Sequence, residues 1–220
     1  MLRSRPVLAG ALLGLMAYKP QLALLIPFAL MAGGEWRALI AAILSQLVLV
    51  LVSLPILGIE PWGAFLYKLA HPAAVFSSSS SDWRSIPSMM IFVRTLGLGT
   101  LAGSIAHWSI ASVAAVGTLW TWRRTQDGVI RMAVLAAAIL LVTPYLRAYD
   151  LLLLVLPVAM LLRGKPDPME KAIIFAAWLV PAVLMFAAPS IQFGPVVTVA
   201  LSVLVFRRAL TGPPAQEDAK

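Results

Sequence analysis

The sequence predicts an all-α protein, a polytopic bundle of about six to eight transmembrane segments, on three observations. The 220 residues are 61% hydrophobic and 12% charged, with a mean hydropathy of +0.92. Soluble domains are about half apolar and a quarter charged. Long runs lack any charged residue and approach the roughly 20 apolar residues of a membrane-crossing helix. The runs also lack the alternation typical of membrane-crossing strands, which favours helices.

Seven apolar stretches are predicted to form this bundle: 7–33, 38–59, 99–122, 130–146, 150–162, 172–188 and 193–206. The first is interrupted at Lys19-Pro20, because proline disfavours the helical conformation of the residue before it. It therefore forms either one long helix or two half-helices. The fifth and seventh are short for full spans. Residues 1–206 are thus predicted to be one transmembrane domain, and 207–220 a short tail.

One long loop, residues 60–98, separates the second and third stretches. Trp62, Phe65, Leu66, Tyr67 and Leu69 give its first part the pattern of an amphipathic helix lying on the membrane surface. The serine run at 77–81 is more typical of a flexible linker than of a binding site.

Orientation follows from the lysines and arginines of the short loops. Ten lie on one side of the predicted bundle: Arg37, Arg123, Arg124, Arg131, Arg163, Lys165, Lys171, Arg207, Arg208 and Lys220. Four lie on the other side: Lys68, Arg84, Arg94 and Arg147. Cytoplasmic loops are enriched in these residues, so the first side, with the C-terminus, is predicted to face the cytoplasm.

Several classes of function are excluded or disfavoured. The net charge of +8 comes from these loop residues, so we expect no nucleic-acid partner. The chain has no cysteine and two distant histidines, His71 and His107, so we expect no metal site. P-loop, Rossmann and hydrolase motifs are absent, and we expect no cofactor.

Ionisable residues in or beside membrane spans are costly and are therefore candidates for function. Lys19 is the first: it is either a buried cation for an anionic ligand or a turn residue that reaches an interface. Arg147 and Asp150, in TPYLRAYDLLLL, are the second. Position alone favours a structural role there, with Asp150 capping the following helix and pairing with Arg147. Arg94, at the mouth of the third stretch, is the third.

Three segments in order carry a family resemblance: GALLGLMAYKPQLALLIPFALMAGGEWRAL (10–39), the loop ending IPSMMIFVRTLGLG, and TPYLRAYDLLLL. Together they resemble, over residues 8–165, the bacterial family-87 glycosyltransferases. These are polyprenyl-phosphate-mannose-dependent membrane mannosyltransferases of the GT-C superfamily. The motifs are a Lys-Pro-Gln break, a Trp-Arg turn, and a proline followed by Tyr-Asp.

The resemblance implies inverting transfer of a hexose, usually mannose, from a polyprenyl-phosphate donor to a glycan or glycolipid acceptor at the outer face of the bacterial cytoplasmic membrane. It places Lys19 and Arg147, with Arg94 as a weaker addition, on the donor phosphate. Gln21, Tyr149 and Asp150 are expected to orient them.

Members of this superfamily usually carry the catalytic aspartate in an outer loop after the first transmembrane helix. The sequence resembles only the later, C-terminal portion, so we expect an N-terminally truncated GT-C-like bundle with no assigned base. A separate N-terminal half or partner subunit would then complete it. Two alternatives stay open, namely an accessory or structural membrane subunit and a lipid or solute transporter.

Overall fold

The computed structural model describes residues 2, 4–70, 86–186 and 191–211, and every regular element within these ranges is helical. Four of the described helices are long and apolar enough to cross a membrane: α4 (Trp36–Leu57), α8 (Gly99–Arg124), α11 (Pro168–Phe186) and α12 (Gly194–Thr211). Shorter apolar stretches cover Pro6–Tyr18, Pro20–Ala32, Gly128–Val142 and Ala148–Leu162. The predicted helical membrane bundle is confirmed.

The first apolar stretch folds as two antiparallel halves. The ascending half is α1 (Pro6–Leu15) with a short 3-10 turn, η1 (Met16–Tyr18), and the returning half is α2 (Pro20–Ala23) with α3 (Ile26–Ala32). Lys19 between them has φ −117° and ψ 89°, outside the helical region, as expected for a residue before proline. Of the two predicted possibilities, the structure selects half-helices.

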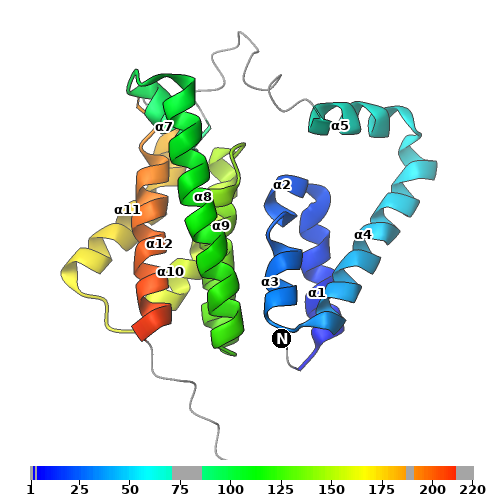
Figure 1. The fold of residues 1–220 in the computed structure, drawn as a ribbon, viewed down its shortest axis with the longest axis horizontal. Coiled ribbons are helices and arrows are strands. Elements are labelled where there is room, and N and C mark those ends of the chain that lie inside the picture. The colour runs from blue at the N-terminus through cyan, green and yellow to red at the C-terminus, as the bar shows by residue number, and fades with distance from the viewer. Residues whose placement is uncertain (1, 3, 71–85, 187–190, 212–220) are drawn as a thin grey trace, which may run out of the picture.

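Helix α4 runs parallel to α1 and packs closely against it. The Ser45 hydroxyl donates to the Ala11 carbonyl (3.1 Å), and Gly10 and Gly14 lie against the backbones of Ala38 and Ala42. Small residues let two membrane helices approach closely. Since α1 and α4 run the same way, α2 and α3 must return the chain to the end where α1 began, and Figure 1 shows this arrangement.

The connection between α4 and α8 contains two helices. The predicted surface helix forms as α5 (Glu60–Ala70), which lies across the end of the bundle (Figure 1). A second helix, α7 (Met89–Thr95), packs on α8 and was not predicted. The serine run at 77–81 lies outside the described residues.

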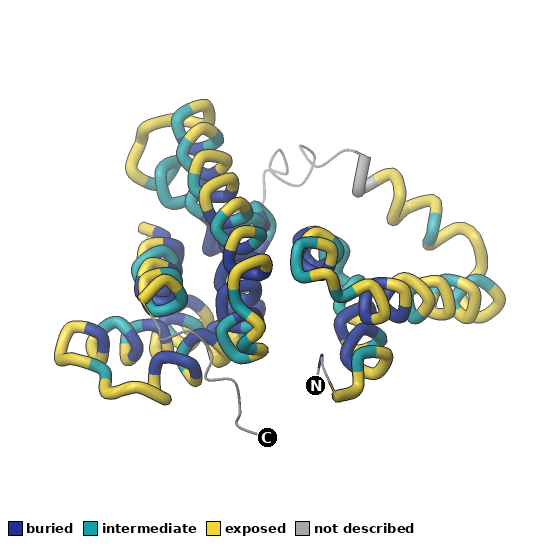
Figure 2. The backbone as a smooth tube through the Cα atoms, turned by 60° about the horizontal axis from the view of Figure 1, so that its bottom comes forward, coloured by how far each residue is buried: buried dark blue, intermediate teal, exposed yellow. Residues whose placement is uncertain are grey.

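Helices α8 and α12 pack on α9 (Gly128–Val142), which is mostly buried (Figure 2), and α11 packs on α12. Helix α9 ends before the predicted residue 146, because Thr143 precedes Pro144 and adopts an extended conformation. The predicted stretch 150–162 is a 3-10 helix, η3 (Ala148–Leu154), followed by α10 (Val155–Leu162). Helix α12 continues to Thr211, into the predicted tail, whose residues 212–220 lie outside the described part.

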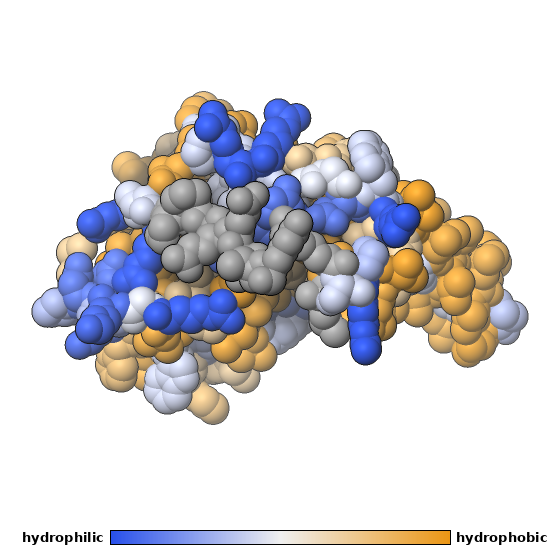
Figure 3. All heavy atoms as spheres, turned by 90° about the horizontal axis from the view of Figure 1, so that it is seen from below, coloured by the Kyte–Doolittle hydropathy of each residue, from blue (hydrophilic) through white to orange (hydrophobic). Residues whose placement is uncertain are grey.

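The two ends of the bundle differ in charge. We call the end that carries α5, Lys19 and η3 the Lys19 end, and the opposite end, with the α8–α9 turn and the C-terminus of α12, the Arg131 end. Figure 3 views the Arg131 end and shows hydrophilic side chains gathered there. The helix ends and turns on this side carry most of the basic residues counted from the sequence: Arg37, Arg123, Arg124, Arg131, Arg163, Lys165, Lys171, Arg207 and Arg208.

Candidate functional site

The Lys19-Pro20 break lies against η3, 131 residues away in the sequence. The Lys19 ammonium donates to Oδ1 of Asp150 at 2.5 Å. The Lys19 side chain is 17% exposed and that of Asp150 is 4% exposed. The structure therefore brings together the two motifs that the sequence analysis treated as separate candidates.

The ammonium of Lys19 also lies over an aromatic ring. Its nitrogen is 4.0 Å from the centroid of Tyr149, within the range in which the face of an aromatic ring attracts a cation. An ammonium has three N–H donors, of which Asp150 takes one and the ring faces another. Lys19 keeps part of its surface exposed between these two partners.

Asp150 holds this arrangement with both carboxylate oxygens. Oδ2 accepts the backbone N–H of Arg147 at 2.9 Å while Oδ1 accepts Lys19. The predicted cap differs in position: Arg147 is the N-cap residue of η3, and Asp150 lies three residues later, in its first turn, and accepts the N–H of Arg147. Asp150 forms an ion pair with Lys19, whereas the i, i+3 spacing had predicted Arg147 as its partner. Asp150 thus contacts Lys19 directly, and Arg147 is an exposed residue beside it.

Gln21 is joined to the end of α9 through its backbone carbonyl. The Thr143 hydroxyl donates to the Gln21 carbonyl at 3.0 Å, which ties the break to the end of α9. Tyr145 follows in the same connection, and burial raises the pKa of its phenol above the ordinary value, so it stays protonated at neutral pH.

Arg94 occupies a different part of the bundle. It lies on α7, whose main neighbours are α8 and α12, and its side chain passes close to Gly103. The contacts of Lys19 described above come from η3 alone. The structure thus gathers Lys19, Gln21, Tyr149 and Asp150, with Arg147 adjacent, whereas the contacts described for Arg94 are with α8.

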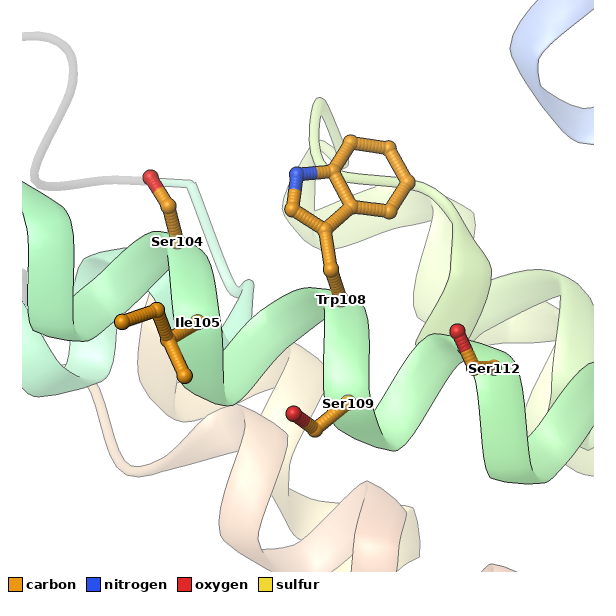
Figure 4. A pocket seen from close by; sticks show the side chains of 5 residues that line it. All are labelled: Ser104, Ile105, Trp108, Ser109 and Ser112. Carbon is orange, nitrogen blue, oxygen red and sulfur yellow. The ribbon is translucent and has the colours of Figure 1, made fainter.

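Helix α8 carries a shallow depression of about 390 Å³ that lacks a charged group (Figure 4). All of its lining residues come from this one helix: Ser104, Ile105, Trp108, Ser109 and Ser112. It offers no cation for a phosphate. Among the described residues, no group of three or more His, Cys, Asp and Glu is placed to hold a metal ion.

A further ion pair, at the Arg131 end, was not predicted from the sequence. Arg131 was counted as a loop residue, but its side chain is 2% exposed and donates to Oε1 of Glu35 at 2.7 Å. Its other donors reach the backbone carbonyls of Thr125 and Trp122, each at 2.7 Å. The 96-residue separation from Glu35 leaves no local signal from which this contact could have been predicted.

Comparison with known proteins supports the resemblance found in the sequence. The sequence model of glycosyltransferase family 87 matches residues 1–144, which include Lys19, Gln21 and Arg94. Tyr149 and Asp150 lie just beyond the match and join the site through their contacts with Lys19. No curated protein and no solved structure matches the chain. The chain belongs to glycosyltransferase family 87, and its apolar helices make it a membrane glycosyltransferase.

Proposed function

We propose that this chain transfers a hexose, mannose in particular, from a polyprenyl-phosphate donor to a glycan or glycolipid acceptor. The reaction takes place at the Lys19 end of the bundle, on the outer side of the bacterial cytoplasmic membrane. The observation that carries the proposal is a lysine held at a helix break by a buried carboxylate, with part of its side chain exposed. Family membership supplies the reaction class.

The chemistry explains the need for cations. An acceptor hydroxyl attacks C1 of the sugar, the bond from C1 to the phosphate oxygen breaks, and the electron pair leaves with the polyprenyl phosphate. Negative charge on the phosphate grows as the bond breaks, so donors fixed in advance lower the barrier. Lys19 and Arg147 supply these donors, with Arg94 as a further candidate.

The charge of the cluster suits this ligand. Lys19 and Arg147 are cations and Asp150 is an anion, which leaves one net positive charge to face the single negative charge of a phosphodiester. The buried carboxylate keeps the lysine in one position, and a preorganised donor costs less ordering on binding.

The proton of the acceptor hydroxyl requires a base. Both oxygens of Asp150 are engaged, by Lys19 and by the Arg147 N–H, so Asp150 acts as a positioning residue. A carboxylate from a separate N-terminal half or a partner subunit is the base in this proposal.

The proposed orientation in the membrane rests on the distribution of arginine and lysine between the two ends of the bundle. The Arg131 end carries most of the loop arginines and lysines, which favours a cytoplasmic location for it and for the C-terminus. The Lys19 end then faces outward, where polyprenyl-linked sugars and their acceptors meet in the outer leaflet.

Binding by the purified full chain in lipid nanodiscs tests the phosphate site, with a long-chain polyprenyl phosphate as the probe. Lys19→Gln and Arg147→Gln should each weaken binding about tenfold, since a hydrogen bond to a charged group contributes about 1.5–3 kcal/mol. Lys165→Gln, at an exposed position of the Arg131 end, is the matched control. Unchanged affinity in both variants would refute the site. Transfer of radiolabelled mannose from the lipid donor, by membranes containing the chain, tests the reaction itself.

A further inference from the structure

Three helix ends meet at the Arg131 end of the bundle, away from the Lys19 site. They are the end of α10, the start of α11 and the end of α12, and the three helices pack on one another. Arg208 of α12 joins them, because its guanidinium donates to the Leu161 carbonyl at the end of α10 (3.0 Å) and to Oε2 of Glu170 in the first turn of α11 (2.6 Å). These contacts fix the three ends relative to one another.

Four other basic residues at this junction are exposed, namely Arg163, Lys165, Lys171 and Arg207. Within the described part of the chain, their side chains form neither an ion pair nor a hydrogen bond. Asp167, in the turn between α10 and α11, is exposed as well. Four cations less one carboxylate leave a net charge of +3 on these exposed groups. The junction therefore presents positive charge that the protein itself leaves uncompensated.

Two of the four cations lie on α11 and α12, which are long and apolar enough to cross a membrane. Lys171 begins an exposed stripe of α11 that continues with Phe175 and Trp178 at helical spacing. On α12, Arg207 follows the exposed Val203 by one turn. Figure 3 shows hydrophilic and hydrophobic side chains side by side over this end. A cation at the end of an exposed apolar stripe lies where hydrocarbon gives way to lipid headgroups, and its long side chain reaches the phosphates.

We infer that the four basic residues at the junction of α10, α11 and α12 bind the phosphate headgroup of an anionic phospholipid, whose tails lie along the exposed stripes of α11 and α12. Charge complementarity selects an anion, and the apolar stripes that continue from two of the cations select an anion with hydrocarbon tails. Basic sites between membrane helices bind such headgroups. This lipid is a component of the surrounding bilayer, so the inference does not depend on the proposed transfer reaction.

The other basic turn at this end, between α8 and α9, lacks these features and provides a control. Arg123 and Arg124 belong to the end of one helix, and the Arg124 guanidinium lies 5.1 Å from the centroid of the Trp120 ring. Removing both arginines takes two positive charges from the same end of the bundle without changing the junction.

Native mass spectrometry of the purified full chain in detergent tests the site, with phosphatidylglycerol as the probe and phosphatidylcholine as the comparison without net charge. Detergent removes the charged bilayer surface that attracts any basic residue. The double variant Lys171→Gln, Arg207→Gln should weaken phosphatidylglycerol binding about twentyfold, since each cation near anionic headgroups contributes a factor of about five. Phosphatidylcholine binding should stay unchanged, and the double variant Arg123→Gln, Arg124→Gln should bind phosphatidylglycerol as the unmodified chain does.

Equal weakening of phosphatidylglycerol binding by the two double variants would show general attraction to the basic end and would overturn the site. Unchanged affinity in Lys171→Gln, Arg207→Gln would overturn it as well. If glycerol phosphate displaces the lipid at equal concentration, the site binds a soluble anion and the lipid is the wrong occupant. Melting temperatures check that the variants are folded; if a double variant is not, Arg207→Gln compared with Arg123→Gln gives the same test, with a loss of about fivefold expected for Arg207→Gln alone.

Discussion

Two ion pairs at opposite ends of this bundle differ in how deeply their cations are buried. Arg131 is 2% exposed and directs its donors to Glu35 and to two backbone carbonyls. Lys19 is 17% exposed, and its hydrogen-bond partner is one oxygen of Asp150. The residue with almost no exposed surface serves the fold, whereas the residue that keeps part of its side chain exposed is accessible to a ligand.

The two cations also show that deep burial alone does not mark a functional residue. An ionisable residue in a membrane protein is a default candidate for function, but the more deeply buried cation here is the structural one. Arg131 joins the α3–α4 turn to the α8–α9 turn and places its guanidinium 5.1 Å from the centroid of the Trp122 ring. The exposed part of its side chain distinguishes Lys19 from Arg131.

Replacing the buried arginine should have the largest effect. Arg131→Ala leaves Glu35 without its partner and empties a packed site, and breaking a buried pair costs about 3–5 kcal/mol. The free energy of unfolding in detergent measures it. Arg123→Ala, on the same side but exposed, should leave stability unchanged. Equal stability of the two variants would show that the Arg131 network is not structural.

A substitution that moves the Lys19-Pro20 break but leaves its charged residues unchanged should have the next largest effect. A Cβ at Gly10 collides with the backbone of Ala38, so Gly10→Ala should loosen α1 from α4 and destabilise the chain by about 1–3 kcal/mol. Gly63→Ala is the control, because a Cβ there meets nothing within 4 Å. Polyprenyl phosphate affinity should fall with Gly10→Ala, since Lys19 moves relative to η3. Retained stability and affinity would mean that α1 does not position the break.

The Lys19–Asp150 pair should contribute less to stability than to binding. In a double-mutant cycle of Lys19→Gln and Asp150→Asn, we expect a coupling energy of about 1 kcal/mol in unfolding, because the two groups are in contact. Asp150→Asn keeps an acceptor for the Arg147 N–H but releases Lys19, so phosphate affinity should fall while the protein stays folded. Additive effects on unfolding would contradict direct contact.

The smallest effect is expected from the hydrogen bond that joins Thr143, at the end of α9, to Gln21. Thr143→Val removes the hydroxyl that donates to the Gln21 carbonyl and keeps the shape of the side chain. One neutral hydrogen bond contributes about 1 kcal/mol. Thr118→Val removes a hydroxyl that bonds only its own helix, at the Ala114 carbonyl, and controls for the loss of a buried hydroxyl. A stability loss no greater than that of Thr118→Val would show that the hydrogen bond from Thr143 to Gln21 does not stabilise the fold.

Much of the architecture was predictable because its causes are local. Apolar length predicted the spans, and the proline after Lys19 predicted the break there. The proline after Thr143 ends α9 before the predicted residue 146 for the same local reason. The amphipathic pattern of residues 60–70 predicted α5. Helix α7 was missed because a short helix gains most of its stability from packing, here on α8.

The sequence by itself determined an all-helical membrane bundle, the Lys19 break and the bias of basic residues toward one end. These depend on hydropathy, on the backbone preferences of neighbouring residues and on counting charges. Only the tertiary structure decided that Asp150 holds Lys19, that Arg131 is buried against Glu35, and that the ends of α10, α11 and α12 meet at Arg208. Each of these joins residues on separate helices, and which side chains meet is set by how the helices pack, for which a single sequence carries no local signal.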